Sequence, residues 1–169
     1  MSNTRSDGNP SASLIDPTTK FPKPPFPEQH QPWPGLASKM QPQPDHGETS
    51  YKGSGRLQGR KALITGGDSG MGRAAAIAYA REGADVAINY LPEEETDAQE
   101  AIALIRDAGR KAVPLPGDIR SEAFCQKLVG QAVDALGGLD ILVSNAGRQF
   151  SCKSILGQIY GSSGGAGQP

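Results

Sequence analysis

Apolar and polar positions follow two alternating patterns between residues 57 and 150. Short apolar runs bounded by glycine or proline predict strands, and we expect them over residues 62–64, 84–89, 111–115 and 139–143. Between these runs, apolar residues recur at helical spacing, as at Ala98, Ala101, Ile102 and Ile105. This spacing predicts helices over residues 70–82, from the acidic run 93–95 to Gly109, and from a Ser121 cap to Gly137.

Strict alternation of strand and helix predicts an α/β fold. The crossover helices make the sheet parallel and cover both of its faces. We expect the N-terminal half of a Rossmann-type doubly wound sheet with strand order 3-2-1-4. A ligand crevice should then lie at the carboxyl ends of strands one and four, where the strand order reverses. Pro114 favours an edge position for strand three, because proline cannot donate to a ladder.

The flanking segments differ in composition from this core. Residues 1–56 hold 10 of the 14 prolines, which predicts an extended, proline-rich N-terminal arm. The arm could dock on its own protein or on a neighbouring subunit, with Phe21, Phe26 and Trp33 as anchors, or it could bind an SH3-type groove as a proline-rich ligand. Residues 57–150 form the expected partial Rossmann-type domain, and residues 151–169 form an irregular tail rich in glycine and serine.

Composition excludes several classes of function. A net charge of −1 and a pI near 6.1 argue against nucleic-acid binding. No apolar run approaches the roughly 20 residues of a membrane span, and the N-terminus lacks a signal pattern, so we expect a cytoplasmic protein. Cys125 and Cys152 form neither a disulfide framework nor zinc spacing, and Cys125 should be a small buried hydrophobe. Both histidines precede the predicted domain, which argues against a metal site or a hydrolase triad.

A glycine-rich stretch, Thr65-Gly-Gly-Asp-Ser-Gly-Met-Gly72, lies between the first predicted strand and the first predicted helix. Glycine lets the backbone turn tightly and approach a diphosphate closely. The helix that follows directs its free N–H groups at the phosphates. A Walker loop is excluded, since no Gly-Lys-Ser/Thr follows. A glycine-rich turn without a ligand is the alternative.

The ordered motifs resemble the short-chain dehydrogenase/reductase family. They are Thr65-Gly-x-x-x-Gly-x-Gly72, Gly117-Asp-Ile119, the strand Leu139–Val143 and Asn145-Ala-Gly147. The arm resembles that of a bacterial subgroup with a long N-terminal extension, often described as aldehyde-reductase-like or glucose-dehydrogenase-like. It does so through Pro17-Thr-Thr-Lys20, Trp33-Pro-Gly-Leu-Ala37 and Asp45-His-Gly-Glu-Thr-Ser50. The resemblance covers roughly residues 16–150, and it implies an oxidoreductase that transfers hydride between NAD(P) and a carbonyl/alcohol pair. Full-length members are expected to form homo-oligomers.

The resemblance also assigns roles to single residues. Gly66, Gly70 and Gly72 would form the diphosphate loop, Asp118 would hold the adenine amino group, and Asn145 would lie beside the cofactor ribose. Asp118 as a plain turn residue is the alternative. The full set of expected cofactor-binding residues is Thr65, Gly66, Asp68, Ser69, Gly70, Met71, Gly72, Asn89, Asp118, Ile119, Asn145, Ala146 and Gly147.

The choice between NAD and NADP stays open. An acid about 20 residues after the loop would hold the ribose 2′-hydroxyl of NAD, but the second strand ends in Asn89. That asparagine would not repel a 2′-phosphate. Arg73 offers positive charge, whereas the acidic run 93–95 opposes it.

The family's catalytic serine and Tyr-x-x-x-Lys pair have no match in this sequence. The four tyrosines are followed four positions on by Gly55, Gly83, Glu94 and Gly164. We therefore expect no catalytic residues here and a C-terminally truncated or frameshifted chain of marginal stability, with strand four at an exposed edge. A genuine short variant is the alternative. The chain could also be a non-catalytic dinucleotide-binding protein, or an interaction protein acting through its arm.

Overall fold

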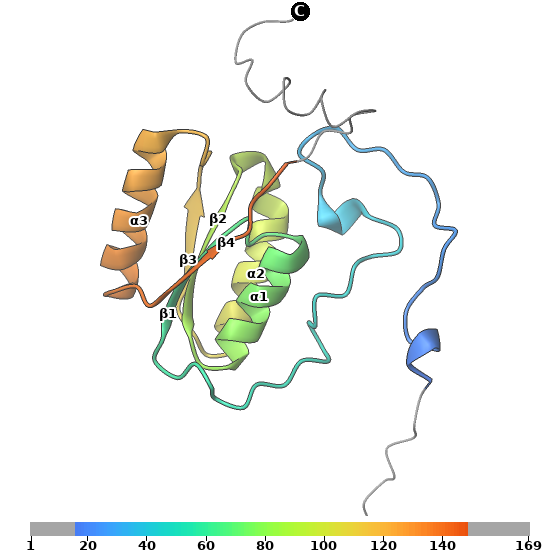
Figure 1. The fold of residues 1–169 in the computed structure, drawn as a ribbon, viewed down its shortest axis with the longest axis horizontal. Helices are drawn as coiled ribbons and strands as arrows, with labels where there is room; N and C mark the ends of the chain where they lie inside the picture. The colour runs from blue at the N-terminus through green and yellow to red at the C-terminus, as the bar shows by residue number, and fades with distance from the viewer. Residues whose placement is uncertain (1–15, 149–169) are drawn as a thin grey trace, which may run out of the picture. The chain divides into compact units, whose positions relative to one another are not determined.

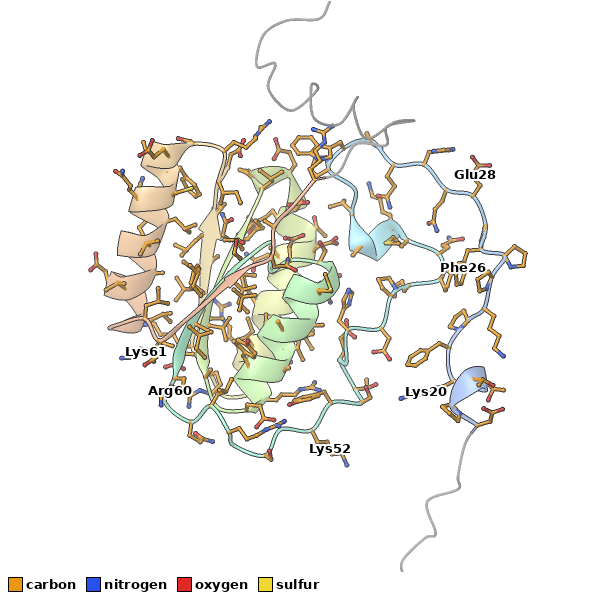
Figure 2. All side chains as sticks on the ribbon, in the orientation of Figure 1. Lys20, Phe26, Glu28, Lys52, Arg60 and Lys61 are labelled. Carbon is orange, nitrogen blue, oxygen red and sulfur yellow. The ribbon has the colours of Figure 1, made fainter. Side chains whose placement is uncertain are left out.

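A computed structural model of the protein describes residues 16–148. The chain divides into two compact units, Met1–His30 and Gln31–Pro169. In the first unit, a short 3-10 helix, η1 (Pro17–Thr19), is capped by Asp16, whose carboxylate accepts the Thr18 N–H at 2.8 Å. The exposed side chains of Lys20, Phe26 and Glu28 belong to this unit (Figure 2). The expected boundaries at residues 56 and 150 stay predictions.

The second unit is built on a four-stranded parallel sheet in the order β3-β2-β1-β4, as the alternating pattern predicts (Figure 1). The strands are β1 (Lys61–Thr65), β2 (Asp85–Tyr90), β3 (Ala112–Pro116) and β4 (Ile141–Ser144). β3 lies at one edge, where the missing N–H of Pro114 costs no ladder bond on the open side. β4 forms the other edge of the sheet within the described residues.

Helices cover both faces of the sheet. Figure 1 shows α1 (Gly70–Arg81) and α2 (Glu95–Asp107) on one side and α3 (Glu122–Leu136) on the other. Each face buries its own apolar cluster: Ile64 and Ile88 of the sheet cluster with Ile102 of α2, and Leu63 clusters with Leu128 of α3. The side chains that fill both layers are drawn in Figure 2. This two-sided burial explains why the strands read as continuous apolar runs.

Two expectations from the sequence need correction. The fourth strand begins at Ile141 and not at Leu139, because the Asp140 carboxylate accepts the backbone N–H of Lys61 at 2.9 Å. The Asp140 side chain thus satisfies the backbone N–H of Lys61, and the paired residues of β1 and β4 begin at Ala62 and Ile141. Cys125 is half-buried and not fully buried, and its thiol donates to the Ile119 carbonyl oxygen at 3.1 Å. It helps to close the turn that leads into α3. Ser121 caps that helix as expected, by accepting the Phe124 N–H at 3.3 Å.

The segment before β1 is fastened to α1 by Glu82. This carboxylate is buried, and it accepts the Tyr51 hydroxyl at 2.5 Å and the backbone N–H groups of Ser54 and Arg56 at 3.0 and 2.9 Å. The Arg56 guanidinium and the Tyr51 hydroxyl hold the pKa of Glu82 well below its ordinary range. Arg81 adds donor bonds to the carbonyls of Gly47, Glu48 and Tyr51.

Within residues 16–148, the structure contains no helix that is long and apolar enough to cross a membrane. The same residues form no cluster of histidine, cysteine, aspartate and glutamate that could hold a metal ion.

Candidate functional site

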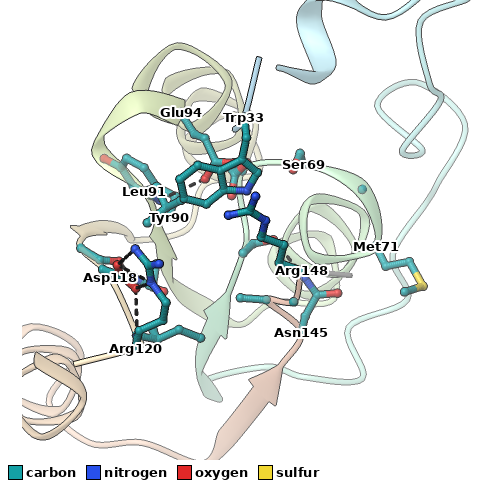
Figure 3. Close-up of a pocket in the computed structure, with 18 residues that line it drawn as sticks. Trp33, Ser69, Met71, Tyr90, Leu91, Glu94, Asp118, Arg120, Asn145 and Arg148 are labelled. Carbon is teal, nitrogen blue, oxygen red and sulfur yellow. Dashed lines mark hydrogen bonds and ion pairs between the residues drawn. The ribbon is translucent and has the colours of Figure 1, made fainter. Parts of the chain in front are cut away.

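A cavity of about 530 Å³ lies at the carboxyl ends of the four strands (Figure 3). The loop after β1 contributes Gly66 and residues 68–71, and the end of β2 with the residue after it contributes Asn89, Tyr90 and Leu91. The turn after β3 and the residues after β4 complete the wall. In doubly wound sheets this edge is the place where ligands bind. The cavity is therefore where the topology expects a functional site.

Most of the residues that the sequence singles out meet in this cavity. The expected residues that line it are Gly66, Asp68, Ser69, Gly70, Met71, Asn89, Asp118, Ile119, Asn145, Ala146 and Gly147. The other two, Thr65 and Gly72, lie behind the wall and support it. Lining residues outside the expected set are Trp33, Tyr90, Leu91, Glu94, Gly117, Arg120 and Arg148. Most of these are next to an expected residue in the sequence. Their proximity to the motifs was therefore the signal that could have identified them as lining residues.

The three motif glycines, Gly66, Gly70 and Gly72, have different structural roles. Gly66 (φ +64°) and Gly70 (φ +52°) have the left-handed backbone that glycine tolerates. A Cβ on Gly70 would meet no protein atom within 4 Å, so this position opens onto the cavity. A Cβ on Gly72 would lie 1.9 Å from the Gly66 carbonyl oxygen. Gly72 therefore lets α1 pack against the loop. Gly66 and Gly70 give the loop between β1 and α1 the shape of a cradle, the name used below for this loop.

Thr65 and Asn145 join the ends of β1 and β4. The Thr65 hydroxyl oxygen accepts the backbone N–H groups of Asn145 and Ala146 at 3.0 and 3.1 Å. The Asn145 side-chain amide donates to the carbonyl oxygens of Thr65 and Gly66, both at 3.1 Å. These bonds place the residues after β4 directly against the glycine loop.

Asn89 joins the ends of β2 and β3. Its buried amide nitrogen donates to the carbonyl oxygens of Leu115 and Gly117, both at 2.9 Å. These two bonds use both donor hydrogens of the amide. Asn89 thus holds the turn at Gly117 against the sheet, and it also lines the cavity.

Asp118 follows that turn and faces Arg120. Its carboxylate accepts the Arg120 backbone N–H at 2.9 Å and the guanidinium Nε at 2.8 Å. The guanidinium lowers the pKa of Asp118 below its ordinary value. The short-range bonds match the turn role that the sequence left open. Asp118 also lines the cavity, so the geometry accommodates both roles.

The cavity wall contains an acidic pair, Asp68 and Glu94. Asp68 is 2% exposed, and within the described residues its Oδ2 has no hydrogen-bond partner. Burial raises the pKa of both carboxyl groups, and the Asp68 charge raises the pKa of Glu94 further. A buried carboxylate oxygen without a donor is costly. It therefore calls for a donor such as water or a ligand hydroxyl.

Tyr90 stands beside this pair at the end of β2. Its hydroxyl donates to Glu95 Oε2 at 2.9 Å. Burial, together with this acceptor, raises the pKa of Tyr90 well above its ordinary value. Tyr90 is therefore a neutral wall residue and not a proton donor poised near pH 7.

Comparison with known proteins agrees with this geometry. The sequence profile described as short chain dehydrogenase matches residues 60–158. The uncharacterized oxidoreductase YhxD of Bacillus subtilis is 61% identical over 144 residues, which are 85% of this chain and 48% of that protein. The chain thus spans about half the length of this curated relative.

Solved structures show the same likeness. A short chain dehydrogenase from Burkholderia cenocepacia in complex with NADP is 45% identical, with a TM-score of 0.52 over 59% of this chain and 40% of that one. One from Mycobacterium paratuberculosis bound to NAD is 39% identical, with a TM-score of 0.51 over 55% and 38%.

The profile match covers more than half of the chain, and the parallel sheet, its glycine loop and the residues after β4 have the arrangement that the motifs predict. The protein belongs to the short-chain dehydrogenase family.

Proposed function

We propose that this chain binds a nicotinamide dinucleotide, NAD or NADP, across the carboxyl ends of its strands. The observation that carries the proposal is the convergence of the glycine loop, Asp118 and Asn145 around one cavity. These groups come from β1, β3 and β4, which are far apart in the sequence. The similarity to dehydrogenase structures bound to NADP and to NAD supports the same ligand class.

The residues of the wall match the parts of such a ligand. The open position at Gly70 and the amino end of α1 would take the diphosphate, because unpaired helix N–H groups favour anions. The unpartnered Asp68 Oδ2 would accept a ribose hydroxyl. Asp118 and Ile119 would bound the adenine ring. Asn145 would hold the ribose side of the wall in place through Thr65 and Gly66.

The reaction that we assign to this site is hydride transfer between the nicotinamide ring and a carbonyl/alcohol pair. The bound nicotinamide would supply the hydride chemistry, and the residues described here would bind and orient it. No tyrosine in the 169 residues is followed four positions on by lysine. We therefore expect these 169 residues alone to bind the dinucleotide without reducing a carbonyl compound.

Isothermal titration calorimetry of the 169-residue chain with NAD⁺ and NADP⁺ tests the binding proposal. Saturable 1:1 binding of either dinucleotide supports it, and heats at the level of buffer dilution would refute it. A parallel assay of NAD(P)H oxidation with small aldehydes tests the expected lack of turnover. Aldehyde-dependent oxidation by the purified chain would show that a proton donor exists outside the family's pattern.

A further inference from the structure

Trp33 is the one tryptophan of the sequence, and it lies in the wall of the cavity although it precedes β1 by almost 30 residues. Its side chain is half exposed. Figure 3 shows its indole ring facing the cavity with the Arg148 guanidinium against it. Aromatic side chains that border a cavity are typical ligand contacts in proteins.

The backbone on either side of Trp33 is closed into a small loop. The Gln31 side chain accepts the Leu36 N–H at 2.8 Å and donates to the Leu36 carbonyl oxygen at 3.0 Å. Directly after this loop, the fully buried carboxylate of Asp97 accepts the Ala37 N–H at 2.5 Å. Asp97 belongs to the first turn of α2. The position of Trp33 is therefore set by bonds to the domain.

Two guanidinium groups lie beside Trp33, and that of Arg120 is paired with the Asp118 carboxylate. The guanidinium carbons of Arg148 and Arg120 lie 4.5 and 5.9 Å from the centre of the indole ring, which is within cation–π range. Arg120 is two residues beyond Asp118, and Leu91 and Glu94 share the same wall. Trp33 thus stands on the β2–β3 side of the cavity, next to the turn to which we assign the adenine ring.

From this arrangement we infer that Trp33 is a ligand-contact residue, and that the segment 31–38 closes the adenosine half of the dinucleotide site. The indole would cover the adenosine beside the Asp118–Arg120 pair. The inference rests on the proposed dinucleotide binding. It adds to the residues at the carboxyl ends of the strands a ligand contact from the segment that precedes β1. The segment before the domain then contributes directly to ligand affinity.

Because Trp33 is the sole tryptophan, its fluorescence reports on this contact directly. We expect NAD⁺ and ADP, which share the adenosine diphosphate group, to quench the emission of the full 169-residue chain. Nicotinamide mononucleotide should leave the emission unchanged. By calorimetry, Trp33→Ala should weaken NAD⁺ binding about tenfold, the order of a lost base–aromatic stack, and Trp33→Phe should restore most of it.

The matched control is Phe26→Ala, which removes an aromatic side chain that is equally exposed and is not among the described residues lining the cavity. Its NAD⁺ affinity should equal that of the native chain. Circular dichroism of each variant checks that the fold is retained. If NAD⁺ binds the native chain without changing its emission, or binds Trp33→Ala within twofold of native affinity, this inference alone fails. Absence of calorimetric binding to the native chain would overturn the proposed function and this inference together.

Discussion

Thr65 and Asn145 are 80 residues apart in the sequence and exchange hydrogen bonds in both directions at the edge of the cavity. The Thr65 hydroxyl oxygen accepts the Asn145 backbone N–H, and the Asn145 side chain donates to the Thr65 carbonyl. A carbonyl at the end of a strand has no ladder partner beyond it, so a side-chain donor must satisfy it. This exchange ties the end of the edge strand β4 to the glycine loop.

Asn145→Ala should lower the free energy of unfolding by about 1–3 kcal/mol, because it leaves two part-buried carbonyl oxygens without their donor. Urea denaturation followed by circular dichroism measures this change. Gln99→Ala removes an amide of similar size from the exposed face of α2 and should change stability by less than about 0.5 kcal/mol. Equal effects of the two substitutions would show that the Asn145 bonds contribute nothing specific.

Gly72→Ala and Gly70→Ala should separate packing from ligand binding. At Gly72 the added Cβ would meet the Gly66 carbonyl oxygen at 1.9 Å, so we expect a loss of about 3 kcal/mol or more, or failure to fold. At Gly70 the Cβ meets no protein atom, and only the positive φ costs about 1–2 kcal/mol. Thermal melts should rank Gly72→Ala below Gly70→Ala. A folded Gly70→Ala should still lose dinucleotide affinity in calorimetry; unchanged affinity would contradict the assigned cradle.

Glu82 should make stability depend on acid pH. Its pKa is depressed in the folded state, so its stabilising contribution is present above its ordinary value of 4.5 and is lost as the pH falls below that value toward the folded pKa. Urea midpoints of the native chain should therefore fall between pH 5 and pH 3. Glu82→Gln should be less stable at pH 7 and should show a flatter fall. A native profile as flat as that of the variant would contradict the Tyr51–Arg56–Glu82 network.

The acidic pair in the cavity wall should influence the choice of dinucleotide. NADP carries one more phosphate than NAD, so removing negative charge from the wall favours NADP more than NAD. Asp68→Asn and Glu94→Gln should each raise the ratio of NADP⁺ to NAD⁺ affinity several-fold in calorimetry. Glu93→Gln, an exposed neighbour outside the wall, is the control and should leave the ratio unchanged. A ratio that moves equally in all three variants would indicate a general charge effect.

Leu142 should promote self-association of the 169-residue chain. It is 59% exposed on the edge strand β4, and it pairs with Leu63, whose face is covered by α3. An exposed apolar edge strand is a site for unwanted strand pairing. Leu142→Lys should therefore lower the concentration-dependent light scattering of the purified chain. Val129→Lys on the exposed side of α3 controls for added charge, and an equal decrease there would argue against a specific role of the edge.

The sequence was sufficient to predict the helices and strands and most of the residues that line the cavity. Periodicity predicts the three helices and four strands to within one or two residues, because each face of the sheet is buried and demands apolar side chains. The glycine loop is predictable from its position between a strand and a helix, and the residues after β4 were indicated by the resemblance to the family. The start of β4 was wrong by two residues, since the bond between Asp140 and Lys61 joins segments 79 residues apart.

What the sequence by itself determined is the α/β alternation, which follows from local periodicity. The alternation indicated the doubly wound fold class and its strand order, and the ordered motifs indicated the family by resemblance. Only the tertiary structure decided how side chains are used. It shows that the Asn89 amide nitrogen donates to the turn after β3, that Asp68 is buried with an oxygen that has no partner among the described residues, and that Trp33 reaches the cavity from outside the strands. These are long-range contacts, and no pattern of neighbouring residues encodes them because chain folding brings their partners together.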